Sequence, residues 1–292
     1  MVRAGALPSA VLGQVFWDQS LLVAGDHEGV LRTLIELAAR GDTGSLSEAV
    51  SMVRNWLKDE PTLVDSSAML DLMWTTMELS LKYRVERAWE WIEALRILAQ
   101  REPERAIKIA IAAMLDGEPS GDREAESLLT ELAPEHPELV MEELGNAMMS
   151  ERGWVFSVSK HSSLISALPI ELVKGWLGRT GIEAARRVAR HLPEPFLGGN
   201  DGTTPEVPEL TTFVLTQYEN DDRTFEEFVS GFHSMQWYTG DIAAQHLREA
   251  EHARKFASHR LRRIREWARI EEEHGLAAAR RWTREVDEDG IE

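Results

Sequence analysis

One helix-start motif recurs along the chain at steps of a little over thirty residues. A proline followed closely by a glutamate and apolar residues occurs at Pro103, Pro137, Pro169 and Pro208, with steps of 34, 32 and 39 residues. Proline is tolerated at the start of a helix because its missing N–H group would have no partner there. A period of this length predicts repeated helical units, each of which buries its apolar face only against its neighbours.

A second pattern precedes the first two of these prolines. Residues 95–103 and 129–137 share the frame Leu-x-x-Leu-Ala-x-x-x-Pro. Over roughly residues 27–218 the chain resembles divergent HEAT-like and TPR-like repeat proteins. That resemblance implies an all-α fold, namely a right-handed α-solenoid of antiparallel helical hairpins.

Helical periodicity runs through most of the chain, whereas alternating runs of β-branched residues are almost absent. Ser45 and Glu48 have capping-box spacing, and apolar residues then recur at three- and four-residue steps as far as Leu57. Most connections between such segments are short and contain glycine, which predicts antiparallel neighbours. The pattern predicts helices at 27–40, 45–58, 66–82, 85–101, 103–115, 122–133, 137–150, 169–179, 181–191, 208–218, 224–233, 241–258, 260–274 and 275–287.

The connection 193–208 is the longest, and its prolines and glycines make it a candidate boundary or mobile excursion. Whether the chain is one part of a split larger protein is left open by its sequence. The expected organisation is an N-terminal extension at 1–26, a helical-repeat solenoid at 27–192, the long loop at 193–208, C-terminal helical repeats or a cap at 209–286, and an acidic tail at 287–292.

Composition excludes several classes of protein. The 292 residues include no cysteine, which rules out a disulfide scaffold, a zinc finger and a thiol nucleophile. The 50 acidic and 32 basic residues give a formal net charge of −18, which disfavours nucleic acid as a partner. No apolar run has the length of a membrane helix, and the first residues are weak as a signal peptide. We therefore expect a cytoplasmic protein that has no membrane partner.

Signatures of common catalytic sites are missing. Glycine-rich nucleotide-binding loops, His-Glu-x-x-His and Gly-x-Ser-x-Gly do not occur. Ser157 and Lys160 match the Ser-x-x-Lys of serine acyl enzymes, but the companion motifs of that class are absent. We therefore expect no catalytic residue and no cofactor.

Two Glu-x-x-His pairs keep one enzymatic alternative open. They are Glu249 with His252 and Glu271 with His274. This spacing places a carboxylate and an imidazole on one helix face, as in di-iron and di-manganese carboxylate bundles. In so acidic a segment, solvated Glu and His side chains are the simpler interpretation.

Two groups of residues are candidate contacts for a protein partner. Trp237 and Tyr238 lie in an expected loop, where aromatic side chains can anchor a partner. Arg186, Arg187 and Arg190 form a basic stripe because positions three and four apart share a helix face. Such a stripe can dock an acidic partner, although most such arginines pair with nearby carboxylates.

Three functional hypotheses follow. The leading one is a non-catalytic scaffold that binds a protein partner within a larger complex. Residues 232–241 and 261–268 resemble C-terminal solenoid portions of bacterial anti-phage defence proteins, which implies a subunit or regulator of a defence complex. The second is an acidic immunity or antitoxin-like neutraliser of a toxic enzyme, which the net charge of −18 fits. The third is the di-metal enzyme.

Overall fold

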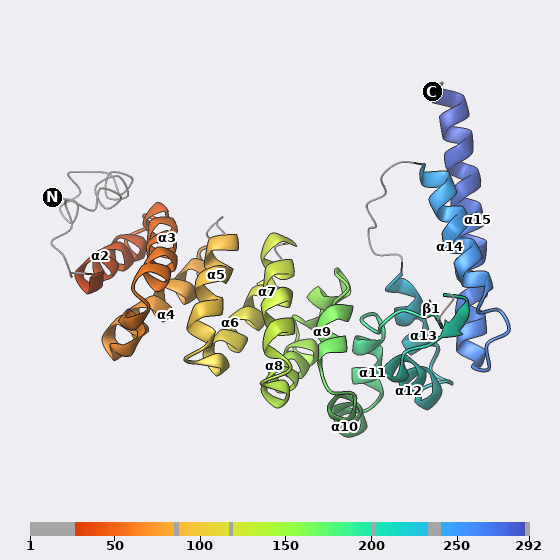
Figure 1. Ribbon diagram of the computed structural model, residues 1–292, viewed down its shortest axis with the longest axis horizontal. Coiled ribbons are helices and arrows are strands. Elements are labelled where there is room, and N and C mark those ends of the chain that lie inside the picture. Colours follow the sequence, from red (N-terminus) through yellow and green to blue (C-terminus); the bar gives the residue numbers. More distant parts are fainter. Residues whose placement is uncertain (1–26, 85–87, 117–118, 200–201, 233–240, 290–292) are drawn as a thin grey trace. The chain divides into compact units, whose positions relative to one another are not determined.

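Helices make up about three quarters of the described chain. The structure is a computed structural model that describes residues 27–84, 88–116, 119–199, 202–232 and 241–289. These residues form fourteen α-helices, two short 3-10 helices and one two-stranded sheet, so the prediction of an all-α fold is confirmed (Figure 1). The α-helices are α2 (His27–Ala39), α3 (Gly44–Asp59), α4 (Ser67–Lys82), α5 (Ala88–Ala99), α6 (Pro103–Asp116), α7 (Pro119–Leu132), α8 (Pro137–Met149), α9 (Ser162–Ala167), α10 (Ile170–Thr180), α11 (Ile182–Ala189), α12 (Glu209–Gln217), α13 (Asp222–Ser230), α14 (Ile242–Arg254) and α15 (Arg262–Asp289); the 3-10 helices are η2 (Pro61–Asp65) and η3 (Gly153–Ser157).

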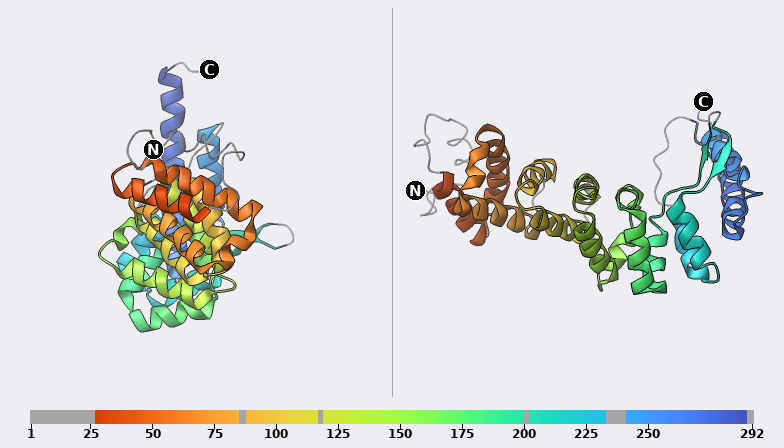
Figure 2. Two further views of the ribbon diagram at one scale, coloured as in Figure 1. Left: turned by 90° about the vertical axis from the view of Figure 1, so that its left-hand side faces the viewer. Right: turned by 60° about the horizontal axis from the view of Figure 1, so that its bottom comes forward.

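The chain divides into two compact units, Met1–Ala147 and Met148–Glu292. In the first unit α2 packs on α3 and α4, and α6 packs on α5 and α7. In the second unit α11 packs on α12 and α13, while α14 and α15 lie side by side (Figure 2). The long connection 193–208 lies inside the second unit.

The recurring prolines mark helix starts in the structure. Pro103 and Pro137 are the first residues of α6 and α8. Pro169 and Pro208 each stand one residue before a helix, at the N-cap of α10 and α12. The motif therefore locates all four helix starts to within one residue.

An aromatic cluster forms part of the core of the second unit. Phe228 of α13 and Phe256, which follows α14, are fully buried. Their rings lie 6.4 and 5.5 Å from the ring of Trp267 in α15. Burying each of these side chains contributes about 1.5–3 kcal/mol, so the cluster holds α13 and α15 together with the end of α14.

The segment 193–208 contains a small hairpin that its sequence does not predict. Strand β1 (Phe196–Gly198) pairs with the antiparallel strand β2 (Thr204–Glu206), and Leu197 faces Pro205 in the register. The glycines between the strands permit the reversal, since Gly199 and Gly202 both have positive φ angles. Strands of three residues carry too little pattern to be recognised in a sequence.

The prediction of separate helices at 260–274 and 275–287 is wrong, because α15 runs without a break from Arg262 to Asp289. Gly275 lies inside this helix and faces α14. A Cβ atom on Gly275 would lie 2.8 Å from the carbonyl oxygen of His246 and 3.0 Å from the Cβ of Ala250. The glycine therefore permits close packing of two helices and does not end one.

Ion pairs recur between residues whose separation is close to the spacing of the recurring prolines, and the cation comes first in most of them, Asp65–Arg101 being an exception. Separations of 34, 35 and 37 residues are typical. Each exposed pair contributes at most about 1 kcal/mol, so their value lies in fixing register more than in stability. The pairs are Lys58–Glu93, Arg96–Glu131, Lys108–Glu143, Lys160–Glu194, Lys174–Glu209, Arg186–Asp221 and Arg190–Glu227.

Replacing Gly275 with alanine is expected to destabilise the second unit. The added methyl group overpacks the contact between α14 and α15 at a cost of about 1–3 kcal/mol, which exceeds the roughly 1 kcal/mol gained in helix propensity. Urea unfolding followed by circular dichroism measures the change. The matched control is Gly178→Ala in α10, where an added Cβ meets no atom within 4 Å and should stabilise slightly. Equal effects of the two substitutions would contradict the packing role of Gly275.

Candidate functional site

The predicted basic stripe lies on α11, and two of its three arginines form ion pairs with α13 or the residue that caps it. The Nε and Nη2 atoms of Arg186 donate to the two carboxylate oxygens of Asp221 at 2.9 and 2.8 Å. Arg190 donates from Nε to Glu227 at 3.1 Å. These two arginines therefore hold neighbouring helices in place.

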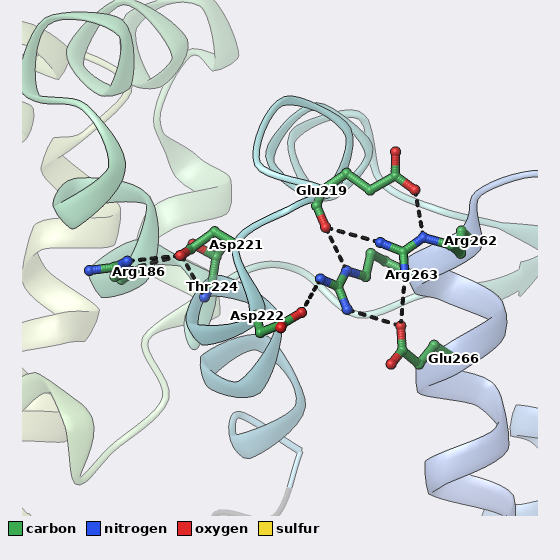
Figure 3. A network of polar contacts seen from close by, with 8 residues as sticks. All are labelled: Arg186, Glu219, Asp221, Asp222, Thr224, Arg262, Arg263 and Glu266. Atoms are coloured by element: carbon green, nitrogen blue, oxygen red, sulfur yellow. Dashed lines mark hydrogen bonds and ion pairs between the residues drawn. The ribbon is translucent and has the colours of Figure 1, made fainter.

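Asp221 has a second role, as the N-cap of α13. Its carboxylate accepts hydrogen bonds from the backbone N–H of Thr224 at 3.0 Å and from the Thr224 hydroxyl at 2.7 Å (Figure 3). The hydrogen bonds from Arg186, followed by those from Thr224, hold the pKa of the Asp221 carboxyl well below its usual range. The carboxylate in turn raises the pKa of Arg186.

The next residue along the chain ties α15 to the same junction. Asp222 accepts a hydrogen bond of 2.6 Å from Arg263, whose side chain is only 4% exposed. Arg263 also donates to the carbonyl oxygen of Glu219 at 2.8 Å and to Glu266 at 3.0 Å (Figure 3). Its guanidinium group lies over the ring of Phe225 as well. This buried guanidinium is thus satisfied on several sides, which a buried charge requires.

Arg187 differs from its neighbours on the stripe. Its ion pair with Glu183 is long, 3.5 Å from Nε to Oε1, and the buried Nε atom has no hydrogen-bond partner among the described residues. The side chain is 36% exposed. Arg187 therefore retains donor capacity that Arg186 and Arg190 have already used.

A half-open pocket of about 390 Å³, here called the α11–α13 pocket, lies between η3, α11 and α13. It brings all three arginines of the predicted stripe together with Arg223 of α13, a residue that the sequence did not single out. Arg223 is exposed and has no ion pair among the described residues. The lining residues are Gly153, Phe156, Ser157, Glu183, Arg186, Arg187, Arg190, His191, Arg223, Glu226 and Glu227.

His191 lines this pocket with a buried, uncharged side chain. Its Nδ1 accepts a hydrogen bond of 3.1 Å from the backbone N–H of His161, and the Phe156 ring meets it edge-on. Burial, together with the charges of Arg190 and Lys160, lowers the pKa of His191 well below its usual value. The imidazole therefore adds no positive charge to the pocket at neutral pH.

Two large apolar side chains adjoin the pocket-lining residues of η3. Trp154 is 60% exposed and Val158 is 67% exposed, whereas Val155 and Phe156 between them point into the core. We call Trp154 and Val158 the exposed pair. Sequence analysis missed both, because a single 3-10 turn has no periodicity that would separate inward from outward positions.

The remaining predicted contact residues, Trp237 and Tyr238, lie outside the described residues. The Ser-x-x-Lys pair is described, and its members bond elsewhere. The hydroxyl of Ser157 donates to the carbonyl of Trp154 at 2.6 Å, and Lys160 binds Glu194 at 2.7 Å.

The two Glu-x-x-His pairs do not gather into a common ligand set. Glu249 bonds to His246 at 3.1 Å, while His252 lies 3.4 Å from the carbonyl oxygen of Pro195. His274 is exposed on α15. Across the described ranges, no group of three or more His, Asp or Glu side chains is arranged to hold a metal ion.

Glu271 of α15 is nevertheless electrostatically unusual. Burial, reinforced by the carboxylates of Glu194 and Glu249, raises its pKa to about 7, while Lys160 acts in the opposite direction. Near neutral pH this carboxyl therefore changes its charge inside the packed second unit.

Comparison with known proteins identifies no relative. No protein-family model matches the chain, and neither a curated protein nor a solved structure matches it. Every helix in the described ranges is too short or too polar to cross a lipid bilayer. The function of this chain must therefore be inferred from its own residues.

Substitution of Asp221 by alanine is expected to lower the free energy of unfolding by about 1–3 kcal/mol, because the cap of α13 is lost and Arg186 loses its partner. Asp221→Asn is the matched control, since asparagine caps a helix equally well but carries no charge. Because the folded-state pKa of Asp221 lies below its unfolded value of 3.8, the advantage of wild type over Asp221→Asn is complete above about pH 4. It should shrink as the pH falls further, and urea unfolding at several pH values measures it.

Glu271 should make stability decrease as the pH rises through neutrality. Its pKa is about 7 in the folded protein and 4.5 when unfolded, so between these values the folded state holds the extra proton. His191 acts in the opposite sense below pH 6.5, because its folded-state pKa is lowered. Wild type and Glu271→Gln share His191, so the difference between their free energies of unfolding isolates the carboxyl. A difference that stays constant from pH 5 to pH 8 would contradict the raised pKa.

Proposed function

We propose that this chain is a non-catalytic α-solenoid scaffold that binds a protein partner at the α11–α13 pocket of its second unit. The observation that carries the proposal is the exposed pair, Trp154 and Val158, whose neighbours in the chain, Gly153 and Ser157, line a pocket that contains four arginines. Large apolar side chains that stand out from a polar surface are typical of protein interfaces.

Two spacings support the solenoid. Helix starts headed by proline recur at 34, 32 and 39 residues, and ion pairs recur at separations of 34 to 37 residues. Equivalent positions in successive segments thus lie close together, as stacked repeats require. Solenoids present extended surfaces on which partners bind, so this architecture suits a scaffold.

The composition of the pocket favours binding over catalysis. Most of its charged groups already bind one another, and its histidine is buried and neutral. A general acid or base needs a group whose proton can reach the substrate. Guanidinium groups instead suit the recognition of carboxylates.

The resemblance to anti-phage defence proteins suggests the setting in which this scaffold acts. We propose that the partner is another component of a bacterial defence complex. The alternative role, an acidic neutraliser, is supported by the net charge of −18. It would use carboxylates against a basic surface, whereas the α11–α13 pocket offers arginines.

Trp154→Ala should weaken capture of the partner by about 10-fold or more, since a buried interface aromatic typically contributes 2 kcal/mol or more to binding. The tagged chain is purified mildly from its source organism, the co-purifying protein is identified by mass spectrometry, and its affinity is then measured. Because the Trp154 side chain is 60% exposed, helicity should be unchanged.

The matched control is Phe196→Ala, which removes an exposed aromatic residue from β1 that does not line the pocket. Its affinity for the partner should equal that of wild type. A tagged chain that elutes alone, or a partner bound equally by wild type and Trp154→Ala, would refute the proposal.

A further inference from the structure

Some arginines of the α11–α13 pocket bind carboxylates of the chain and others do not. This difference indicates the kind of ligand that the pocket can bind. We propose that the pocket binds an acidic segment of the partner, with Asp or Glu carboxylates at Arg187 and Arg223 and an adjacent apolar side chain on the exposed pair. This inference rests on the proposed function and adds the chemistry of the partner to it.

Two of the four arginines, Arg187 and Arg223, form no hydrogen bond with a carboxylate among the described residues. Arg186 and Arg190 already bind Asp221 and Glu227 at ordinary hydrogen-bond distances. Arg187 has only the 3.5 Å contact with Glu183, and Arg223 has no ion pair among the described residues. A guanidinium group carries five N–H donors and no acceptor, so these two side chains call for an acceptor ligand.

Most of the carboxylates that line the pocket already bind an arginine. Glu183 is shared by Arg186 and Arg187, and Glu227 binds Arg190. Among the carboxylates that line the pocket, Glu226 has no ion pair within the described ranges. The four arginines are matched in number by Glu183, Asp221, Glu226 and Glu227, so the pocket offers guanidinium N–H donors and no excess of charge, which fits a singly charged carboxylate better than a polyanion.

A phosphate or a nucleic acid fits less well than an acidic peptide. Glu226 lines the pocket and opposes a dianion more strongly than a singly charged carboxylate. The exposed pair also offers apolar contact area, which a peptide side chain can cover and a free phosphate cannot.

The walls of the pocket are held before any ligand arrives. The bonds among Arg186, Asp221 and Thr224 join α11 to the first turn of α13 (Figure 3). At the other end of α13, a Cβ atom on Gly231 would lie 2.3 Å from the carbonyl oxygen of Arg190, so the glycine permits direct backbone contact. Arginines carried by fixed helices lose less freedom on binding, which favours affinity.

Binding of short fluorescein-labelled peptides to the full chain, measured by anisotropy, tests this inference. One peptide contains Glu, Asp and Leu, and a second has Gln and Asn in place of the acids. We expect the acidic peptide to bind about 10-fold more tightly or better, and to weaken at high salt. Arg187→Gln and Arg223→Gln should each weaken its binding about 5- to 10-fold.

Matched variants separate charge recognition from loss of structure. Arg179→Gln removes an exposed arginine of α10 that does not line the pocket and has no ion pair within the described ranges, and it should bind the peptide as wild type does. Arg187→Lys keeps the charge and the packing stem but loses the planar fork, so it should bind with intermediate affinity. Circular dichroism checks that each variant is folded.

Equal binding of the acidic and neutral peptides, or unchanged binding by folded Arg187→Gln and Arg223→Gln, would overturn the inference. Its failure is distinguishable from failure of the proposed function. If the partner depends on Trp154 but not on these arginines, the scaffold stands and the acidic ligand is wrong. If the acidic peptide depends on the arginines while no partner depends on Trp154, the pocket's ligand stands and the scaffold proposal falls.

Discussion

The second unit depends on the paired carboxylates at the start of α13. Asp221 caps this helix and at the same time binds Arg186 of α11, while Asp222 binds the buried Arg263 of α15. Two adjacent residues thus connect three helices. Of these charged side chains Arg263 is the most deeply buried, at 4% exposed, and a charge so placed is tolerated only when it has partners. The α11–α13 pocket inherits its shape from this arrangement.

Much of the helical layout could be predicted from the sequence, because it follows from local rules. The four prolines locate helix starts to within one residue. The capping box expected at Ser45 and Glu48 is not formed, because Ser45 lies inside α3 and its hydroxyl donates to the carbonyl oxygens of Leu34 and Asp42. The same local rules misjudged Gly275. Glycine usually ends a helix, but here it permits a close contact with His246 and Ala250 of α14, which lie 29 and 25 residues earlier in the chain. Tertiary packing decided that position, and no local pattern carried the information.

The candidate site was only partly predictable for the same reason. The shared face of Arg186, Arg187 and Arg190 follows from helix geometry, and the structure places all three in one pocket. Which of them binds a carboxylate depends on Asp221 and Glu227 at α13, so the difference between the arginines became visible only in the fold. Arg223 and Trp154 belong to other elements, and nothing in their local sequence connects them with α11.

The regular spacing of the ion pairs bears on how a chain of this kind changes during evolution. Each cation in the series meets a carboxylate about 35 positions further on. Insertion or deletion of one whole unit of about this length would again place a cation beside an equivalent carboxylate. Insertion of a few residues within a helix would instead misalign the ion pairs of that helix. Related chains should therefore differ in the number of their helical units while keeping the length of each unit nearly constant.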